Sequence, residues 1–328
     1  MSENGVTANF DGRYTIMACA LAAVGSAKSH FGRKHWCRYC GCTDPAKFTN
    51  IAHLIPEGLG NHWLISSDEC DRCNAKFSEY ESNLISAVRP ILTVGGTAGK
   101  ANKVGQTGRT AGKSVIMHGN HEGRRQISIR ASADETKMQI DPSSRHLQTS
   151  FPVAPVPFRP RLAYKALARI GYALLPDAEL NHFTKLLAWL CDRNDPEDFP
   201  CLEVGISIGL LGNAPDIVSG TLLRRVAPTD KIPYMLFVLC AGSVCLMIDL
   251  MSDRMDDHLT WAPMGRVDIN WSIVLGPNRE LTINYGKFRP MNWASIHLIA
   301  QPIKNLVLDF NMMTTEGRFS AVFRDEWR

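Results

Sequence analysis

The sequence lacks any apolar run close to the ~18 residues that a membrane-spanning helix needs, so we expect no membrane partner. It also lacks a strong charge of either sign, because 36 basic and 32 acidic residues leave a formal net charge of only +4. This balance permits a polyanionic partner without requiring one. With 45% hydrophobic and 21% charged residues, the 328-residue chain has the composition of an ordinary globular protein, and its length favours two domains.

A framework of disulfide bonds is not expected either. The chain contains ten cysteines, but disulfide-rich secreted domains are usually smaller and denser in cysteine. Five of the ten fall within residues 37–73, as two Cys-x-x-Cys pairs with one further cysteine between them. Clustered pairs of this kind indicate a bound metal and a reducing compartment, so we expect a cytoplasmic protein.

Composition divides the chain into three parts. Residues 1–94 hold a cysteine- and histidine-rich stretch (residues 30–90, here called the cysteine module) behind an N-terminal extension. The alanine-rich segment 14–26 of that extension is predicted as a short buried helix. Residues 95–160 form a connecting region that is first basic and glycine-rich and then proline-rich. Residues 161–328 are predicted as a regulatory or targeting domain.

The expected fold class is α+β in both domains. In the cysteine module, short strands at 48–54 and 63–65 precede a helix, which gives a ββα unit. Ser66 and Glu69 have the spacing of a capping box and predict the start of that helix, while Pro90 predicts its end.

The third part of the chain is predicted to mix helices and strands. Two helices are expected at 161–175 and 177–191. The apolar runs within 233–250 flank an Ala-Gly-Ser turn and predict a hairpin. Further strands are expected at 281–288 and 303–311.

The two cysteine pairs predict a structural zinc site. Cys37 and Cys40 form the first pair and Cys70 and Cys73 form the second, with 29 residues between the two pairs. Four thiolates enclose one Zn²⁺ tetrahedrally, at about 2.3 Å each. The ion would tie the segment before the first strand to the first helical turn, and its binding would supply much of the folding energy of so small a unit. Cys42 is expected to be a bystander.

Polar residues of catalytic type lie between and just after these pairs. His53 is followed by Leu-Ile-Pro, Asn61 lies further along the same stretch, and Asn74 directly follows Cys73. In type, order and spacing they resemble the HNH endonucleases of the zinc-bound CxxC…HxxP…CxxCN type, over about residues 35–90. The resemblance implies a ββα-metal fold and the hydrolysis of phosphodiester bonds.

The resemblance also implies a role for each of these residues. His53 matches the general base, which takes a proton from the attacking water. Asn74 matches a ligand of the catalytic metal, which is Mg²⁺ or else Mn²⁺ or Ni²⁺ and stabilises the developing charge. Asn61 matches the middle polar position, which orients the loop or the base.

The sequence departs from the family pattern at Ala52, where many HNH enzymes have a metal-binding acid immediately before the histidine. Asn74 alone is a weak ligand for Mg²⁺. Three explanations stay open: another residue replaces the acid, with His62, Glu57 and Asp68 the nearest candidates; the metal binds only together with the substrate phosphate; or catalysis is lost. A ligand such as His62 would favour Mn²⁺, Ni²⁺ or Zn²⁺ over Mg²⁺.

Basic residues gather around the two cysteine pairs and predict contacts with nucleic-acid phosphates. Arg33, Lys34 and Arg38 surround the first pair, and Arg72 and Lys76 lie on the predicted helix. DNA is the expected substrate, with RNA as an alternative.

The preferred interpretation is therefore a metal-dependent DNA endonuclease, and the resemblance makes defence against foreign DNA an implied role. One rival is a catalytically inactive zinc module that binds nucleic acid beside a C-terminal interaction or sensor domain. Another is a nuclease that is switched on by a ligand or protein bound to the C-terminal domain.

Overall fold

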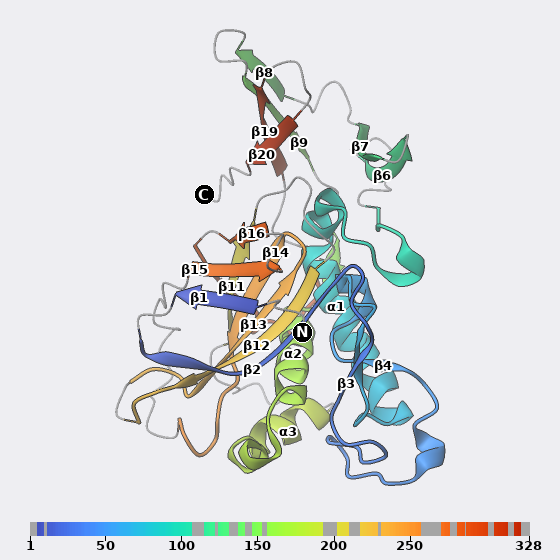
Figure 1. The fold of residues 1–328 in the computed structure, drawn as a ribbon, viewed down its shortest axis with the longest axis vertical. Helices are drawn as coiled ribbons and strands as arrows, with labels where there is room; N and C mark the ends of the chain where they lie inside the picture. The colour runs from blue at the N-terminus through green and yellow to red at the C-terminus, as the bar shows by residue number, and fades with distance from the viewer. Residues whose placement is uncertain are drawn as a thin grey trace.

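The computed structural model describes fifteen stretches of the chain. They are residues 5–9, 12–106, 115–121, 124–130, 137–141, 146–152, 156–192, 202–209, 217–228, 231–256, 270–275, 281–285, 287–300, 305–313 and 318–322. Together they form a mixed α+β structure, as predicted (Figure 1). Within these ranges, no helix is both long and apolar enough to cross a membrane.

An antiparallel sheet of six strands lies at the centre of the fold. Its strand order is β17 (Arg289–Asn292), β11 (Glu203–Ile208), β14 (Val244–Asp249), β13 (Met235–Ala241), β12 (Ile217–Arg225) and β2 (Tyr14–Ala23). The predicted hairpin is confirmed, because β13 and β14 pair directly and turn at Gly242, whose φ of +53° favours glycine. Side chains of β13 alternate between two apolar clusters, one on each face of the sheet.

The N-terminal extension is a strand, and the predicted helix at 14–26 is wrong. Strand β2 pairs along the whole length of β12, from Tyr14 opposite Arg225 to Ala23 opposite Ile217. Ala20 and Ala22 point into one face of the core and Tyr14 into the other. Alanine favours helices locally, but here pairing with a buried strand outweighs that preference.

Three α-helices accompany the central sheet. They are α1 (Asp71–Gly95), α2 (Pro160–Ala173) and α3 (Thr184–Cys191). Helix α2 packs on β12 and β13, and a side chain on Gly171 would come within 2.7 Å of Leu250, so glycine permits this close approach. Helix α1 packs alongside α2, which places the cysteine module beside the central sheet (Figure 1).

The predicted helix limits need correction at several points. Helix α1 begins at Asp71 because Ser66 ends a strand and its hydroxyl donates to Asp68 instead of capping the helix. It continues through Pro90 and ends at Gly95. The next residue, Gly96, caps the helix in the left-handed conformation. The predicted helix 161–175 corresponds to α2. The predicted helix 177–191 is split at Phe183 into the 3-10 helix η4 (Asp177–His182) and α3.

The cysteine module is built on a small sheet of three strands. Strand β5 (Leu64–Ser66) is central, with β3 (Ser29–Phe31) parallel to it and β4 (Ala52–His53) antiparallel. Two 3-10 helices, η1 (Pro45–Lys47) and η2 (Glu57–Leu59), lie in its loops. The expected ββα unit is thus present as β4, β5 and α1, and most of its buried apolar residues belong to the same cluster as those of α2.

Shorter sheets complete the described structure. Their strands are β1 (Gly5–Asn9), β15 (Asn270–Leu275) and β16 (Leu281–Asn284); β6 (Val115–His121) and β7 (Arg124–Arg130); β8 (Lys137–Asp141), β9 (His146–Pro152), β19 (Asn305–Met313) and β20 (Arg318–Val322); and β10 (Pro157–Phe158) with β18 (Ile299–Ala300). The 3-10 helix η3 (Lys100–Asn102) follows α1. Strand β9 pairs with β19, and strand β2 pairs with β12. Each of these two sheets therefore joins strands from different parts of the chain, if the parts are divided by composition at residues 94 and 160.

Candidate metal and catalytic site

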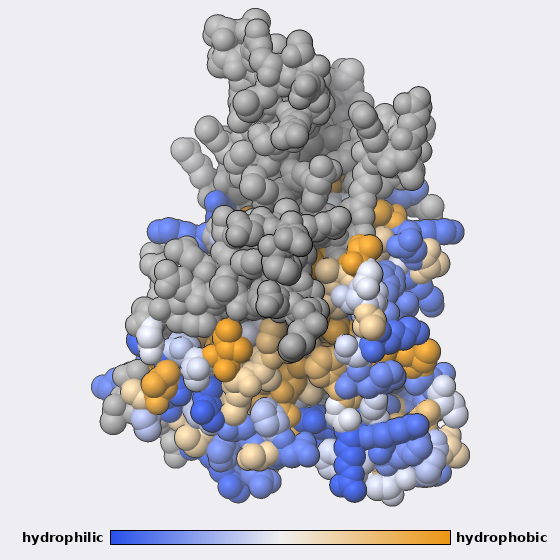
Figure 2. Space-filling model, viewed as in Figure 1, coloured by the Kyte–Doolittle hydropathy of each residue, from blue (hydrophilic) through white to orange (hydrophobic). Residues whose placement is uncertain are grey.

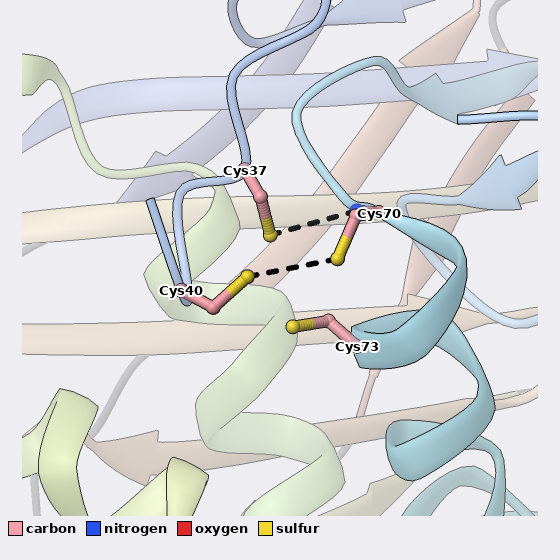
Figure 3. Close-up of side chains that lie close together, drawn as sticks. All are labelled: Cys37, Cys40, Cys70 and Cys73. Carbon is pink, nitrogen blue, oxygen red and sulfur yellow. Dashed lines mark hydrogen bonds between the residues drawn. The ribbon is translucent and has the colours of Figure 1, made fainter. Parts of the chain in front are cut away.

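Four cysteine side chains meet at the start of α1 (Figure 3). The Sγ atoms of Cys37, Cys40, Cys70 and Cys73 all lie within 4.8 Å of one another. The first pair lies on a tight loop, where the Gly41 N–H donates to the Cys37 carbonyl at 2.8 Å. The second pair comes from the residue before α1 and from its first turn. This spacing fits the tetrahedral sulfur shell of a zinc ion.

The electrostatics of the four thiols also fit a cation. The pKa of Cys37 is lowered to about 4, chiefly by the hydrogen bond from Cys73, while the pKa of Cys73 is raised. Burial raises the pKa of Cys70 to about 11. Several thiolates this close together repel one another, and a bound Zn²⁺ would offset their negative charges. Among the described residues, no other group of three or more His, Cys, Asp or Glu converges in this way.

His53 lies at the end of β4, directly after the buried Ala52. Its side chain is half-buried, and this burial lowers the pKa of the imidazole, although the Glu57 carboxylate acts in the opposite direction. The ring is therefore neutral at pH 7 and able to accept a proton, as a general base must be. The segment before β4 is held by Asp71, which accepts hydrogen bonds from the N–H groups of Thr49 and Asn50.

Asn61 is fully buried and holds the loop that joins β4 to β5. Its Nδ2 donates to the carbonyls of Ile55 at 2.6 Å and Leu64 at 2.8 Å. Its Oδ1 accepts from the N–H groups of Trp63 at 3.0 Å and Leu64 at 2.8 Å. Every bonding group of the side chain is thus used within the loop that follows His53.

We expect Asn61→Ala to lower the free energy of unfolding by roughly 2–4 kcal/mol, because four buried hydrogen bonds are lost and their main-chain partners stay buried. Urea unfolding of the zinc-loaded protein measures this change. Asn181→Ala, at an exposed asparagine, is the matched control. A loss below about 1 kcal/mol for Asn61→Ala would contradict the structural role.

The three candidates to replace the acid at position 52 differ in their availability. Asp68 is buried and already accepts from Arg38 and Ser66, so it is not free to bind a metal. His62 is half-buried, and its Nε2 donates to the Ala98 carbonyl at 3.2 Å, which leaves Nδ1 facing Glu57 at 3.9 Å. Glu57 and His62 therefore remain as candidate metal ligands, and both act electrostatically on His53.

Asn74 lies in the first turn of α1 and is half-buried. Its main-chain N–H donates to the Cys70 carbonyl at 2.9 Å, so the residue is anchored to the cysteine cluster. Among the described residues, a contact joins His62 to Glu57, but no hydrogen bond or ion pair joins either residue to the Asn74 side chain. An imidazole ligand would favour Mn²⁺ or Ni²⁺ over Mg²⁺.

The basic residues predicted to contact nucleic acid divide into two groups. Arg33, Lys34 and Arg72 are exposed, and hydrophilic side chains cover the lower part of the described surface, where the loops of the cysteine module lie (Figure 2). Lys76 is half-buried and its Nζ donates to the Cys191 carbonyl. Arg38 needs a correction: it is only 8% exposed and is bound within the protein, so it does not face a partner.

Arg169 is a residue of this site that the sequence did not indicate. It lies in α2, far along the chain, and its side chain is completely buried beneath β4. It donates to the main-chain carbonyls of His53 and Leu54. No local pattern marks it, because a lone arginine in an amphipathic helix usually faces solvent.

Comparison with known proteins agrees with this geometry. Residues 37–85 match the family model described as HNH endonuclease. The matched range begins at Cys37, includes His53 and Asn74, and ends within α1. Comparison with curated proteins and with solved structures gives no match.

Proposed function

Because residues 37–85 form an HNH endonuclease module, we propose that this protein is a metal-dependent endonuclease that hydrolyses DNA phosphodiester bonds, with His53 as the general base. The observation that carries the proposal is the match of residues 37–85 to the HNH endonuclease model, a range that contains His53 at the end of β4 and the four-cysteine cluster. A neutral imidazole takes up a proton near neutral pH, which an attacking water must lose.

In the proposed reaction, His53 accepts a proton from water while the water oxygen bonds to phosphorus. The bond from phosphorus to the leaving deoxyribose oxygen breaks, and that oxygen takes a proton from solvent. Asn74 and His62 would hold the divalent ion, and the ion would supply positive charge to offset that of the phosphate. Asn61 holds the loop that follows the base, and the four cysteines would hold a zinc ion that fixes the first cysteine loop to α1.

The proposed DNA contacts are the exposed side chains of Arg33, Lys34 and Arg72. We expect Arg33→Ala with Lys34→Ala to weaken DNA binding and to make the slope of log K against log salt less negative by about 2, because two phosphate contacts are lost. Fluorescence anisotropy across a salt series measures the slope. Lys231→Ala with Lys287→Ala removes the same charge from exposed positions outside the cysteine module and should leave it unchanged.

The first test is cleavage by the full-length protein. Supercoiled plasmid, single-stranded DNA and RNA are each incubated with Mg²⁺, Mn²⁺ or Ni²⁺, and with a chelator as control. We expect nicked and linear plasmid with Mn²⁺ or Ni²⁺, weaker cleavage with Mg²⁺, and none with the chelator. An absence of cleavage under every metal would overturn the proposal, and cleavage of RNA alone would reassign the substrate.

One observation favours a second candidate function. Ala52 is only 2% exposed and has no group that binds metal, where the family commonly has an acid. A module that binds nucleic acid without cutting it would fit this residue. DNA binding in the anisotropy assay together with no cleavage would identify that alternative. Defence against foreign DNA and a partner for the C-terminal half stay predictions.

A further inference from the structure

Arg169, in the C-terminal half of the chain, contacts the main chain of His53 directly. Its Nη1 donates to the Leu54 carbonyl at 2.8 Å and to the His53 carbonyl at 3.1 Å, and its Nη2 also donates to the His53 carbonyl at 3.1 Å. The planar guanidinium is suited to such a fork, because it presents several N–H groups in a fixed geometry.

The same guanidinium also contacts two acidic residues, one of which directly precedes Cys70 of the four-cysteine cluster. It forms an ion pair with Glu69, the residue before Cys70, and lies 3.5 Å from Glu81 of α1. The Arg169 side chain of α2 therefore contacts β4, the residue before the second cysteine pair, and α1.

A second arginine crosses the same interface from the other side. Arg38, within the first cysteine pair, donates through Nη1 to the Leu175 carbonyl just after α2, at 2.6 Å. Its Nε donates to Asp68 at 2.6 Å. The consecutive acids Asp68 and Glu69 are thus held by one arginine from each half of the chain, immediately before Cys70.

We propose that Arg169 is a positioning residue of the nuclease site, and that α2 is therefore an integral part of that site. This inference rests on the proposed function. Arg169 fixes the main chain at His53 relative to the zinc cluster, so that the imidazole is oriented toward water and phosphate. A displacement of about 1 Å at a catalytic group is enough to lower a rate about a hundredfold.

The main test is Arg169→Lys, which keeps the positive charge beside Glu69 but loses the fork to two carbonyls. We expect normal zinc content, a kcat for plasmid nicking at least tenfold lower, and a KM within about twofold of wild type. The ring signals of His53 in ¹⁵N-histidine NMR should shift. Arg161→Lys is the matched control, because this buried arginine of the same helix donates through Nε to the carbonyl of Ala294, a residue outside the cysteine module.

Arg169→Met with Glu69→Gln and Glu81→Gln is the second variant, because it removes the buried arginine together with both of its acidic partners and so leaves no unpaired buried charge. We expect it to fold, to hold zinc and to keep the low kcat. Wild-type kcat and unshifted His53 signals in either variant would overturn the positioning role. If the wild-type protein cuts no substrate, the proposed function fails, but the His53 signals still decide whether Arg169 orients that residue.

Discussion

Replacing Cys73 with serine is expected to reduce the bound zinc from about one ion per chain to nearly none and to unfold the cysteine module. Cys73 supplies one of four convergent sulfur atoms and is 5% exposed. Structural zinc contributes roughly 10–16 kcal/mol to folding in small zinc-finger peptides, so a damaged site has a large effect. Total metal analysis and thermal unfolding of the reduced protein measure the change.

Cys42→Ser is the matched control for this prediction. Cys42 lies two residues after Cys40 and is half-buried, but it is outside the four-sulfur cluster. It contacts the cluster through its main chain, where its carbonyl accepts from the Cys37 N–H at 2.8 Å. We expect this variant to keep its zinc. Equal zinc in both variants, or no zinc in the wild-type protein, would contradict a four-cysteine site.

His53→Ala is expected to lower the rate of plasmid nicking about a thousandfold, within the range for losing a general base. The zinc content should stay normal, because His53 is not part of the cysteine cluster. The wild-type rate should also depend on pH. Since burial lowers the pKa of His53, the base is already neutral at pH 7, and the rate should fall only below the usual range of histidine.

His297→Ala provides the control for the kinetic comparison. His297 is exposed and lies near β18, outside the cysteine module. It should nick plasmid at the wild-type rate. A wild-type rate that instead falls between pH 9 and 7 would mean that a group with a higher pKa is the base, and the role given to His53 would be wrong.

Much of the site could be predicted because its signals are local. The spacing of two Cys-x-x-Cys pairs is sufficient to indicate four convergent thiols, and the structure brings those four together. The apolar runs around Gly242 likewise predict a hairpin from neighbouring residues alone. The family match at residues 37–85 confirms the resemblance.

The rest depends on contacts between distant residues, which local patterns do not contain. Strand β2 forms because β12 pairs with it some 200 residues later, against the helix preference of its alanines. Arg38 looks like a phosphate contact in sequence, yet α2 and Asp68 bury it. Arg169 serves the site from a helix that no motif connects to it, so only the packing of α1 against α2 identifies it.

The most direct test of the account compares wild-type protein, His53→Ala and Cys42→Ser on supercoiled plasmid with Mn²⁺, after metal analysis shows equal zinc in all three. The account predicts rapid nicking by the wild type and by Cys42→Ser, and almost none by His53→Ala. Equal nicking by all three would place the activity elsewhere, and no nicking by any of them would contradict the nuclease assignment.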